Sequence, residues 1–431
     1  MAIIVSTPQD LENIRNNLNE HYIQANDISL SDHMSHDPYR TWNPIDNFAG
    51  IYDGNGYTIS GVQLNRAGYV GFFGAAGHGP LIKNVNIRLH STIGGFYVGS
   101  LVGAMQGGRI ENCSSAIIGG GSILGQDTVG GFIGLSIGTD FYNCRCHCRV
   151  VADLLSLDWV REAILYSPDH GGKTFLVEVP TADTGGFIGY VQDADMEFCY
   201  AQGSVRSGSE ELDEYNWYAL QTGGFAGKIT GTTTVSKCYS INSVAGTFSI
   251  GGFVGVLEEN ASIDNSFSQG LRLMHNDYNI WMVDEGLYYK IIRGNAGFVG
   301  LNNTDQGSYV HLYSASDVDP VYLDQVKGFV DPWDWGELQT GGFGGHGHPE
   351  VTAISNYYDS DITFHEDNYI AEPKQTPPMK TIYNYTGWDF ENIWDIEEGI
   401  TYPWLRWPTE DAIPSKLWVK RSNKWIQIKR H

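Results

Sequence analysis

The chain has 431 residues with a formal net charge of −24 at pH 7, and 53 of its residues are glycine. The negative charge excludes a basic, counterion-displacing body of the kind that nucleic-acid-binding proteins use. Transmembrane helices are excluded as well, because no run of 18 or more apolar residues occurs.

The N-terminal residues predict a short capping helix. Thr7 has the side chain of a helix N-cap, and Pro8 fits the first helical position. We expect the helix to cover residues 9–19 and to shield the first coil of the repeats that follow, so that residues 1–60 form an N-terminal cap and first coil. No basic segment followed by a long apolar run precedes the helix, and we therefore expect no secretory leader unless one has been removed.

Eight five-residue glycine steps recur along the chain, and their starts lie 28 to 55 residues apart. The shortest spacings indicate a bare coil of about 30 residues, and the longer ones indicate insertions. The steps are Val70-Gly71-Phe72-Phe73-Gly74, Gly99-Ser100-Leu101-Val102-Gly103, Gly130-Gly131-Phe132-Ile133-Gly134, Gly185-Gly186-Phe187-Ile188-Gly189, Gly223-Gly224-Phe225-Ala226-Gly227, Gly251-Gly252-Phe253-Val254-Gly255, Ala296-Gly297-Phe298-Val299-Gly300 and Gly341-Gly342-Phe343-Gly344-Gly345.

A second signal follows the steps at a nearly fixed distance. Cys113, Cys144 and Cys199 lie ten residues after the last glycine of a step, and Cys238 lies eleven after. With a third short strand such as residues 203–205, each coil is predicted to run strand, turn, strand, turn, strand. The sequence therefore predicts an all-β fold, a right-handed parallel β-helix (β-solenoid) of about eight coils.

These steps resemble the GLUG motif of bacterial adhesin-type and phage-borne β-solenoids. Two further segments resemble the same family, Phe48-Ala49-Gly50-Ile51-Tyr52 near the N-terminus and Gly387-Trp388-Asp389-Phe390 near the C-terminus. The resemblance covers roughly residues 5–407 and implies a GLUG-type solenoid at 61–407. Proteins with this fold serve as spacers, adhesive stalks and virion parts, so the resemblance implies a scaffold and specifies no activity.

Four insertions interrupt the predicted coils, at about 150–183, 205–221, 270–295 and 315–340. Insertions in a repeat protein tend to emerge on one face, which is often the binding face. Most of these are rich in Tyr, Trp, Asp and Glu. Two interpretations stay open: the aromatic side chains either pin each loop to the rod or form a contact surface. The candidates for a binding surface are Tyr215, Trp217, Tyr218, Trp281, Trp333 and Trp335.

The C-terminal part predicts a hydrophobic plug followed by a basic hairpin. Trp388, Trp394, Trp404 and Trp407 are candidates for a plug over the far end of the rod, since an open solenoid exposes edge strands. Residues 408–431 read as a hairpin of two alternating runs. Residues 416–431 carry a charge of +6 and the first 415 residues carry −30. The candidate residues for anchoring a partner are Trp418, Lys420, Arg421, Lys424, Trp425, Lys429 and Arg430.

The six cysteines favour buried thiols over disulfides or a metal site. Four of them share one register, which predicts an inward column, and Cys144, Cys146 and Cys148 alternate along one strand. Zinc sites use separated pairs of ligands, and Cys146-His147-Cys148 is too tight to wrap a tetrahedral ion. We expect no metal and no cofactor.

Catalysis on a glycan is the one enzymatic alternative. Glycoside hydrolysis needs two carboxyl groups at a defined separation, and Asp193, Asp195 and Glu197 alternate along one predicted strand. With 50 acidic residues in the chain, such groupings arise readily by chance. We therefore expect no catalytic residue and interpret these three as weak candidates on a solvated face.

Three functions compete on this sequence. We expect a non-enzymatic bacteriophage virion component, such as a tail fibre, appendage or decoration protein, which attaches through its basic C-terminus. Its expected partners are other virion structural proteins and a host surface glycan or protein, without nucleic acid or membrane insertion, and a homo-oligomer is left open. The alternatives are a bacterial cell-surface adhesin, hence an extracellular location, and a tailspike-like polysaccharide depolymerase.

Overall fold

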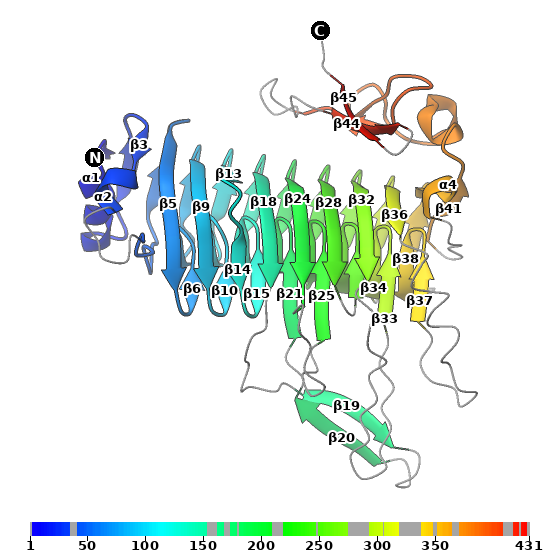
Figure 1. The fold of residues 1–431 in the computed structure, drawn as a ribbon, viewed down its shortest axis with the longest axis horizontal. Coiled ribbons are helices and arrows are strands. Elements are labelled where there is room, and N and C mark those ends of the chain that lie inside the picture. The colour runs from blue at the N-terminus through cyan, green and yellow to red at the C-terminus, as the bar shows by residue number, and fades with distance from the viewer. Residues whose placement is uncertain are drawn as a thin grey trace.

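The computed structural model is a rod of stacked coils (Figure 1). Its strands form four long sheets, named A to D here, in which each neighbouring pair of strands runs parallel. The predicted β-solenoid is therefore confirmed. The structure describes residues 2–34, 41–152, 162–167, 173–178, 181–208, 219–246, 249–274, 293–304, 306–318, 338–347, 351–363, 370–407, 417–421 and 424–428.

Sheets C and D hold eight strands each, one for every glycine step, which confirms the predicted number of coils. Sheet D consists of β6 (Tyr69–Val70), β10 (Tyr97–Val98), β15 (Thr128–Gly130), β21 (Thr181–Gly185), β25 (Ala219–Gly223), β29 (Ser249–Gly251), β33 (Arg293–Ala296) and β37 (Leu338–Gly341). Sheet C consists of β7 (Phe73–Ala76), β11 (Val102–Gln106), β16 (Ile133–Ile137), β22 (Ile188–Gln192), β26 (Ala226–Thr230), β30 (Val254–Glu259), β34 (Val299–Thr304) and β38 (Gly344–Gly347).

Sheets A and B extend beyond the eight coils into both ends of the rod. Sheet A consists of β1 (Ile3–Val5), β2 (His21–Gln24), β4 (Ile51–Asp53), β8 (Leu81–Lys83), β12 (Arg109–Glu111), β17 (Asp140–Tyr142), β23 (Asp195–Glu197), β27 (Thr234–Ser236), β31 (Ser262–Asp264), β35 (Ser308–Val310) and β39 (Thr352–Ile354). Sheet B consists of β3 (Ile28–Ser29), β5 (Thr58–Arg66), β9 (Asn86–Gly94), β13 (Ser114–Ile117), β14 (Ile123–Gly125), β18 (Arg145–Ala152), β24 (Tyr200–Ser207), β28 (Tyr239–Gly246), β32 (Phe267–Met274), β36 (Tyr313–Val318), β40 (Tyr357–Asp359) and β41 (Glu372–Lys374).

Each coil passes through the sheets in the order D, C, A and B, so it contains four strands where the sequence predicts three. The difference lies at the glycine step. In the third coil, β15 ends at Gly130 and β16 begins at Ile133, so Gly131 and Phe132 form a bend that splits one predicted strand into two. A Cβ atom on Gly131 would lie 2.1 Å from the carbonyl oxygen of Gly186 in the next coil, so the bend requires glycine.

The glycines that flank this bend are held against backbone atoms of their own or a neighbouring coil. A Cβ atom on any of eight of them would approach a backbone atom to 2.7 Å or less. These residues are Gly130, Gly134, Gly185, Gly189, Gly223, Gly227, Gly251 and Gly255. The spacing of the steps thus reflects a steric requirement of the stacked backbones.

The phenylalanine of each step fills the interior of the rod. From the third coil onward these rings stack in one ladder, with centroids 4.7 to 5.1 Å apart and no exposed surface. The ladder consists of Phe132, Phe187, Phe225, Phe253, Phe298 and Phe343. Offset stacking of aromatic rings adds to the burial of their apolar surface, so the ladder ties each coil to the next.

Replacing Gly223 with alanine tests the steric role of the step. The new Cβ atom would lie 1.8 Å from the carbonyl oxygen of Ala226, and we expect G223A to destabilise the rod by about 3 kcal/mol or more. Gly77→Ala is the matched control, because its Cβ atom would meet nothing within 4 Å. Thermal unfolding followed by circular dichroism measures both; equal melting temperatures for the two variants would contradict the steric explanation.

The N-terminal cap forms where predicted but is shorter. Helix α1 (Pro8–Asn13) starts after the N-cap Thr7, whose side chain and that of Asp10 form a capping box. A 3-10 turn, η1 (Ile14–Asn16), replaces the rest of the predicted helix, where asparagine residues with low helix propensity accumulate. Leu11 and Ile14 are buried against the first coils, and a short helix α2 (Ser31–Met34) follows β3.

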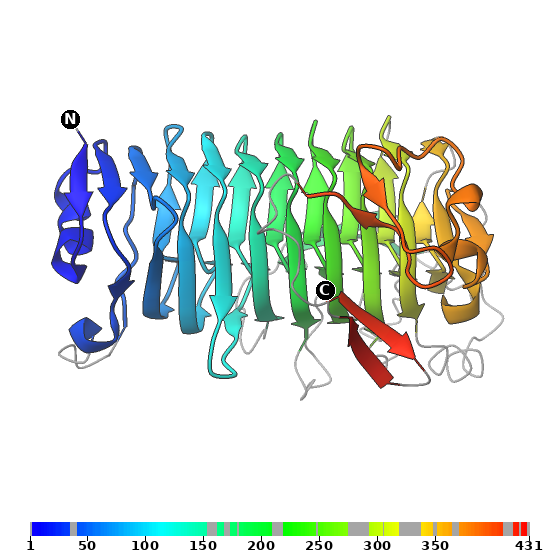
Figure 2. The same ribbon diagram turned by 90° about the horizontal axis from the view of Figure 1, so that it is seen from above.

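The C-terminal residues do not plug the end of the rod as the sequence predicted. Strand β41 is the last strand of sheet B, after helix α4 (Ser360–Thr363), and the chain then turns back along the outside of the coils (Figures 1 and 2). We call residues 375–407 the strap. It contains the 3-10 turns η3 (Pro378–Lys380) and η4 (Ile382–Asn384) and the antiparallel pair β42 (Trp394–Asp395) and β43 (Trp404–Leu405).

Two antiparallel hairpins complete the described elements. Strands β19 (Glu162–Ser167) and β20 (Lys173–Glu178) pair within the first insertion. Strands β44 (Leu417–Arg421) and β45 (Lys424–Ile428) pair near the C-terminus, which confirms the predicted hairpin.

Candidate functional site

All four insertions leave the rod at the same edge. In every case a strand of sheet B precedes the insertion and a strand of sheet D follows it: β18 and β21, β24 and β25, β32 and β33, β36 and β37. Where no insertion occurs the same connection is short, as between Gly94 of β9 and Tyr97 of β10. We call this the insertion edge (Figure 1, lower side).

The predicted binding aromatics lie outside the described residues. These are Tyr215, Trp217, Tyr218, Trp281, Trp333 and Trp335, together with Lys429 and Arg430 of the predicted anchor. The other anchor residues lie on the two strands of the C-terminal hairpin. Trp418, Lys420 and Arg421 belong to β44, and Lys424 and Trp425 belong to β45. Both groups therefore remain predictions.

The opposite end of the sheet B strands is the corner where sheet A turns into sheet B. In each coil the corner residue has a positive φ, between 43° and 56°. Asparagine adopts this left-handed conformation most readily among non-glycine residues, and it occupies the corner in half of the coils. The corner residues are Asn84, Asn112, Asn143, Phe198, Lys237, Asn265, His311 and Ser355.

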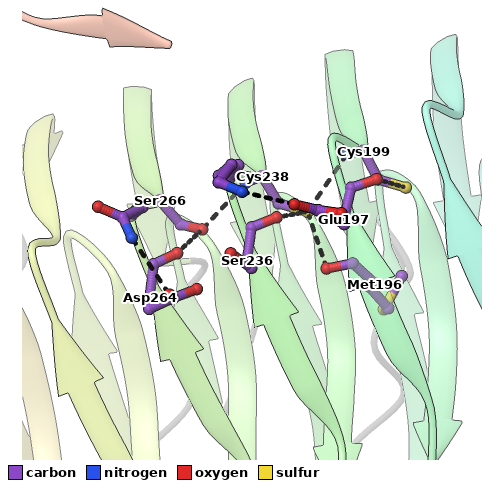
Figure 3. Close-up of polar contacts among 9 residues, drawn as sticks. Met196, Glu197, Cys199, Ser236, Cys238, Asp264 and Ser266 are labelled. Atoms are coloured by element: carbon purple, nitrogen blue, oxygen red, sulfur yellow. Dashed lines mark hydrogen bonds and ion pairs between the residues drawn. The ribbon is translucent and has the colours of Figure 1, made fainter. Parts of the chain in front are cut away.

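The residue after each corner is buried, and several cysteine and serine side chains at this position link one coil to the next. The Cys238 thiol accepts a hydrogen bond from the backbone N–H of Cys199 at 3.3 Å and donates to the carbonyl oxygen of Ser236 at 3.2 Å. One coil further, the Ser266 hydroxyl accepts from the N–H of Cys238 at 3.0 Å and donates to the Asp264 carbonyl at 2.7 Å. Figure 3 shows these side chains in the same position on successive coils.

All six cysteines are free and buried, which confirms the predicted column of thiols. Burial raises the pKa of the Cys146 and Cys199 thiols, so they stay protonated at neutral pH and act as weak hydrogen-bond donors. Within the described part of the chain, no group of three or more His, Cys, Asp or Glu side chains could hold a metal ion. The column is thus a structural element of the corner.

Ser266 allows a direct test of this role. Ser266→Ala leaves the buried N–H of Cys238 without its acceptor, and we expect a loss of about 1–3 kcal/mol in unfolding free energy. Ser266→Cys is the matched control, because cysteine makes the same two contacts at position 238, and we expect a loss below about 1 kcal/mol. Chemical denaturation compares the two; an alanine variant as stable as wild type would show that the column contributes nothing.

The weak catalytic candidates make contacts between coils. Asp193 lies in a turn, not on a strand, and its carboxylate accepts hydrogen bonds from the N–H and hydroxyl of Thr232 at 2.9 and 3.1 Å. These bonds lower its pKa, which is unfavourable for a general acid. Glu197 forms an ion pair with Lys237 at 2.5 Å, and Asp195 lies on β23 with an exposed side chain.

The strap covers a ladder of aromatic side chains on the outer face of sheet B. The first residue of each strand from β24 to β40 is aromatic, and these rings form a buried cluster separate from the interior of the rod. The first four stack with centroids 4.6 to 5.0 Å apart. The ladder consists of Tyr200, Tyr239, Phe267, Tyr313 and Tyr357.

Three tryptophans attach the strap to this ladder and to the corner beside it. Trp407 packs edge-on against Tyr200 and Tyr239, each with centroids 5.4 Å away, and its indole N–H donates to the Asn143 side chain at 2.9 Å. Trp394 packs on Tyr313 and donates to the Asn265 side chain at 3.2 Å. In the same way the indole of Trp388 donates to the backbone carbonyl of Ser355 at 2.9 Å.

A buried carboxylate fastens the strap to the last coil. Asp359, at the end of β40, accepts hydrogen bonds from the hydroxyl of Tyr402 at 2.5 Å and from the hydroxyl of Thr376 at 2.8 Å. Burial raises the pKa of Asp359, while these hydrogen bonds oppose that shift. Two strap residues that are far apart in sequence, Thr376 and Tyr402, thus meet one acidic group.

The strap ends at Trp407, on the side of the rod. Trp407 lies at the corner between sheets A and B, beside Asn143 and Tyr200, and not at an end of the rod. Strand β24 runs from Tyr200 at this corner to Ser207 at the insertion edge, a distance of about 23 Å at ~3.3 Å per residue. Trp407 and the insertions therefore lie at opposite ends of the sheet B strands.

Trp394 tests how the strap is held. We expect Trp394→Ala to weaken docking by about 3–5 kcal/mol, because a fully buried indole is lost, and to make the strap sensitive to limited proteolysis. Trp394→Phe, which removes the N–H but keeps a ring, should cost about 1 kcal/mol. Tyr383→Ala is the control, since this side chain is 91% exposed. Equal protease resistance of all three variants would contradict the assignment.

Comparison with known proteins finds only partial relatives, and no family model matches the chain. A protein of Evansella cellulosilytica described as a Gly-rich membrane protein is 37% identical over 127 residues, which is 26% of this chain and 14% of that protein. Halomucin of Haloquadratum walsbyi is 37% identical over 93 residues, 21% of this chain and 1% of halomucin. The chain thus matches a small part of either relative's length.

Two solved structures resemble the chain at low identity. A Bacteroides ovatus protein described as an immunoglobulin A1 protease aligns with 15% identity and a TM-score of 0.45, covering 95% of this chain and 93% of that one. A second IgA1 protease aligns with 12% identity and a TM-score of 0.43, covering 82% of this chain and 21% of that one. Among the described residues, no helix has the length and apolar character to span a membrane.

Proposed function

We propose that this chain is a non-enzymatic structural and binding protein whose β-helix holds two functional regions apart. The observation that carries the proposal is the position of the strap. It brings residue 407 to the corner of sheets A and B, while all four insertions start at the other end of the sheet B strands. A rod with this arrangement can be fixed along one side and present the insertions on the other.

Within this class we propose a bacteriophage virion component of the GLUG-type solenoid family, such as a tail fibre, appendage or decoration protein. A charge of +6 on residues 416–431 favours attachment to an acidic surface of another virion protein. The aromatic insertions would then face a host surface glycan or protein. The lateral position of residue 407 supports a rod that lies against its particle instead of one attached by its tip.

A bacterial cell-surface adhesin is the second candidate. The partial similarity to a protein that is described as a Gly-rich membrane protein supports it. In that case the chain would be part of a longer, extracellular protein. The contacts of Asp193 and Glu197 do not favour the third alternative, a polysaccharide depolymerase.

The C-terminal hairpin provides the test of attachment. We expect deletion of residues 408–431 to leave a folded rod that no longer joins its particle, because the basic hairpin is lost. Gel analysis and immunogold microscopy of purified particles measure incorporation, and circular dichroism checks the fold.

The combined variant Lys420→Gln, Arg421→Gln and Lys424→Gln is the matched charge control and should also fail to join. Normal incorporation of the truncated protein would show that the hairpin is not the anchor. Recovery of the intact protein in the cell-envelope fraction, with none on particles, would favour the adhesin.

A further inference from the structure

Charge is divided between two sheets of this acidic protein. The strands of sheet B from β5 to β32 contain no aspartate or glutamate and hold six arginines: Arg66, Arg88, Arg145, Arg149, Arg206 and Arg272. Sheet A carries six acidic residues over the same coils: Asp53, Glu111, Asp140, Asp195, Glu197 and Asp264. In a chain of net charge −24, sheet B is therefore locally basic.

The strap leaves the N-terminal half of this basic sheet uncovered. Its last aromatic contacts reach β24 and β28 through Trp407, so β9, β13 and β18 lie beyond it. On these three strands Arg88, Ala116 and His147 share one register position. The small side chain of Ala116 thus lies between two longer nitrogen-bearing ones, and Ser114 occupies the corresponding position beside Asn86 and Arg145. We call this area the basic face.

Arg88 and Arg149 of the basic face differ from the other cations on the coils. Lys83, Arg109 and Lys228 each pair with a carboxylate of their own coil or a neighbouring one. Among the described residues, by contrast, no carboxylate lies within ion-pair distance of Arg88 or Arg149. Within the described part of the chain, their guanidinium groups therefore have hydrogen-bond donors that no carboxylate occupies.

His147 and Arg145 also contribute to the basic face. Burial, followed by the charges of Arg145 and Arg88, lowers the pKa of His147 to about 4. The imidazole is therefore neutral at pH 7 and can donate or accept a hydrogen bond. Arg145 also lies within hydrogen-bonding reach of the Tyr200 hydroxyl, beside the end of the strap.

We propose that the basic face, formed by β9, β13 and β18, binds an acidic polysaccharide through the carboxylate or sulfate groups of its sugars. Arg88 and Arg149 would each bind one anionic group, with two hydrogen bonds from the planar guanidinium. The small side chains of Ser114 and Ala116 on β13, between β9 and β18, leave room for a sugar ring to approach the sheet. This site does not depend on the proposed attachment through the hairpin, and it reaches toward the insertion edge, because Arg149 lies three residues before the end of β18 at Ala152.

The charge distribution favours a glycan over a nucleic acid. Duplex DNA presents one charge about every 1.7 Å, and the acidic body would repel such a dense polyanion. An acidic polysaccharide has fewer charges per length, which suits separate arginines, and repulsion from sheet A is screened within about 8 Å at physiological ionic strength. Single strands bind on exposed aromatic platforms, whereas the strap covers Tyr200 and Tyr239.

The test measures binding of the full chain to polygalacturonate and to dextran sulfate, with neutral dextran as the control polymer. The two acidic polymers distinguish carboxylate from sulfate recognition. We expect binding of at least one of them by calorimetry, weakening as salt rises. The double variant Arg88→Gln, Arg149→Gln should raise its Kd about tenfold or more.

Matched variants keep the result unambiguous. Arg109→Gln removes an arginine of sheet A that is paired with Glu111, and should bind as wild type does. Arg88→Lys, Arg149→Lys keeps the charge, and should retain more affinity than the glutamine pair; melting curves check that every variant folds. The chain that ends at residue 407 should bind at least as tightly, so failure of the hairpin as an anchor would leave this proposal intact.

Three results would overturn the proposal. These are equal binding of neutral dextran, no loss of affinity in the glutamine pair, and no binding of either acidic polymer. Binding of a short DNA duplex as tight as that of the acidic polymers would overturn the assignment to a glycan.

Discussion

Each residue of a coil lies over the residue in the same position of the next coil, because all neighbouring strands of the four sheets pair in parallel and in register. Like side chains therefore stack on like. One position gives the ladder of buried phenylalanines inside the rod. Another gives the thiols and hydroxyls at the corner of sheets A and B, and a third gives the aromatic ladder outside it. The main stabilising features inside and along the rod are columns of this kind.

The columns also determine where the chain can carry an insertion without disturbing the pairing of the strands. An insertion between sheets B and D lengthens a connection and leaves the paired strands in register, and all four insertions occur there. The corner between sheets A and B lacks this freedom, since its positive-φ residues and inward hydrogen bonds fix a tight turn. That corner instead receives the strap, whose indole groups donate to Asn143 and Asn265. The two ends of a sheet B strand are thus suited to different uses.

Sequence patterns predicted the features that repeat at one position of successive coils. They missed the strap, because its place depends on a contact between two segments that are distant in the sequence. Closely packed backbones require glycine at each step, so the recurrence of the steps alone predicts eight coils. In the same way, the register of Cys144 and Cys199 predicts a buried column. The four tryptophans from 388 to 407 were expected at the end of the rod, because an open edge strand needs a cover. The aromatic residues directly after Cys199 and Cys238 were the available signal for the strap, since a ring facing outward in successive coils needs a partner.

The outer face of sheet B shows how one column serves two purposes along its length. From β24 onward its first position is aromatic and lies beneath the strap; in β9, β13 and β18 the same position holds Asn86, Ser114 and Arg145. An uncovered stack of aromatic rings would favour association with other proteins. The first residue of the sheet B strands is therefore aromatic in the coils that the strap covers and polar in the coils before it. The polar part then has no carboxylate in its own strands to neutralise its arginines, although the chain as a whole has a large excess of them. An excess of this kind would readily supply partners if the face had only to be soluble. Their exclusion from this half of the sheet is consistent with a surface that binds an acidic ligand.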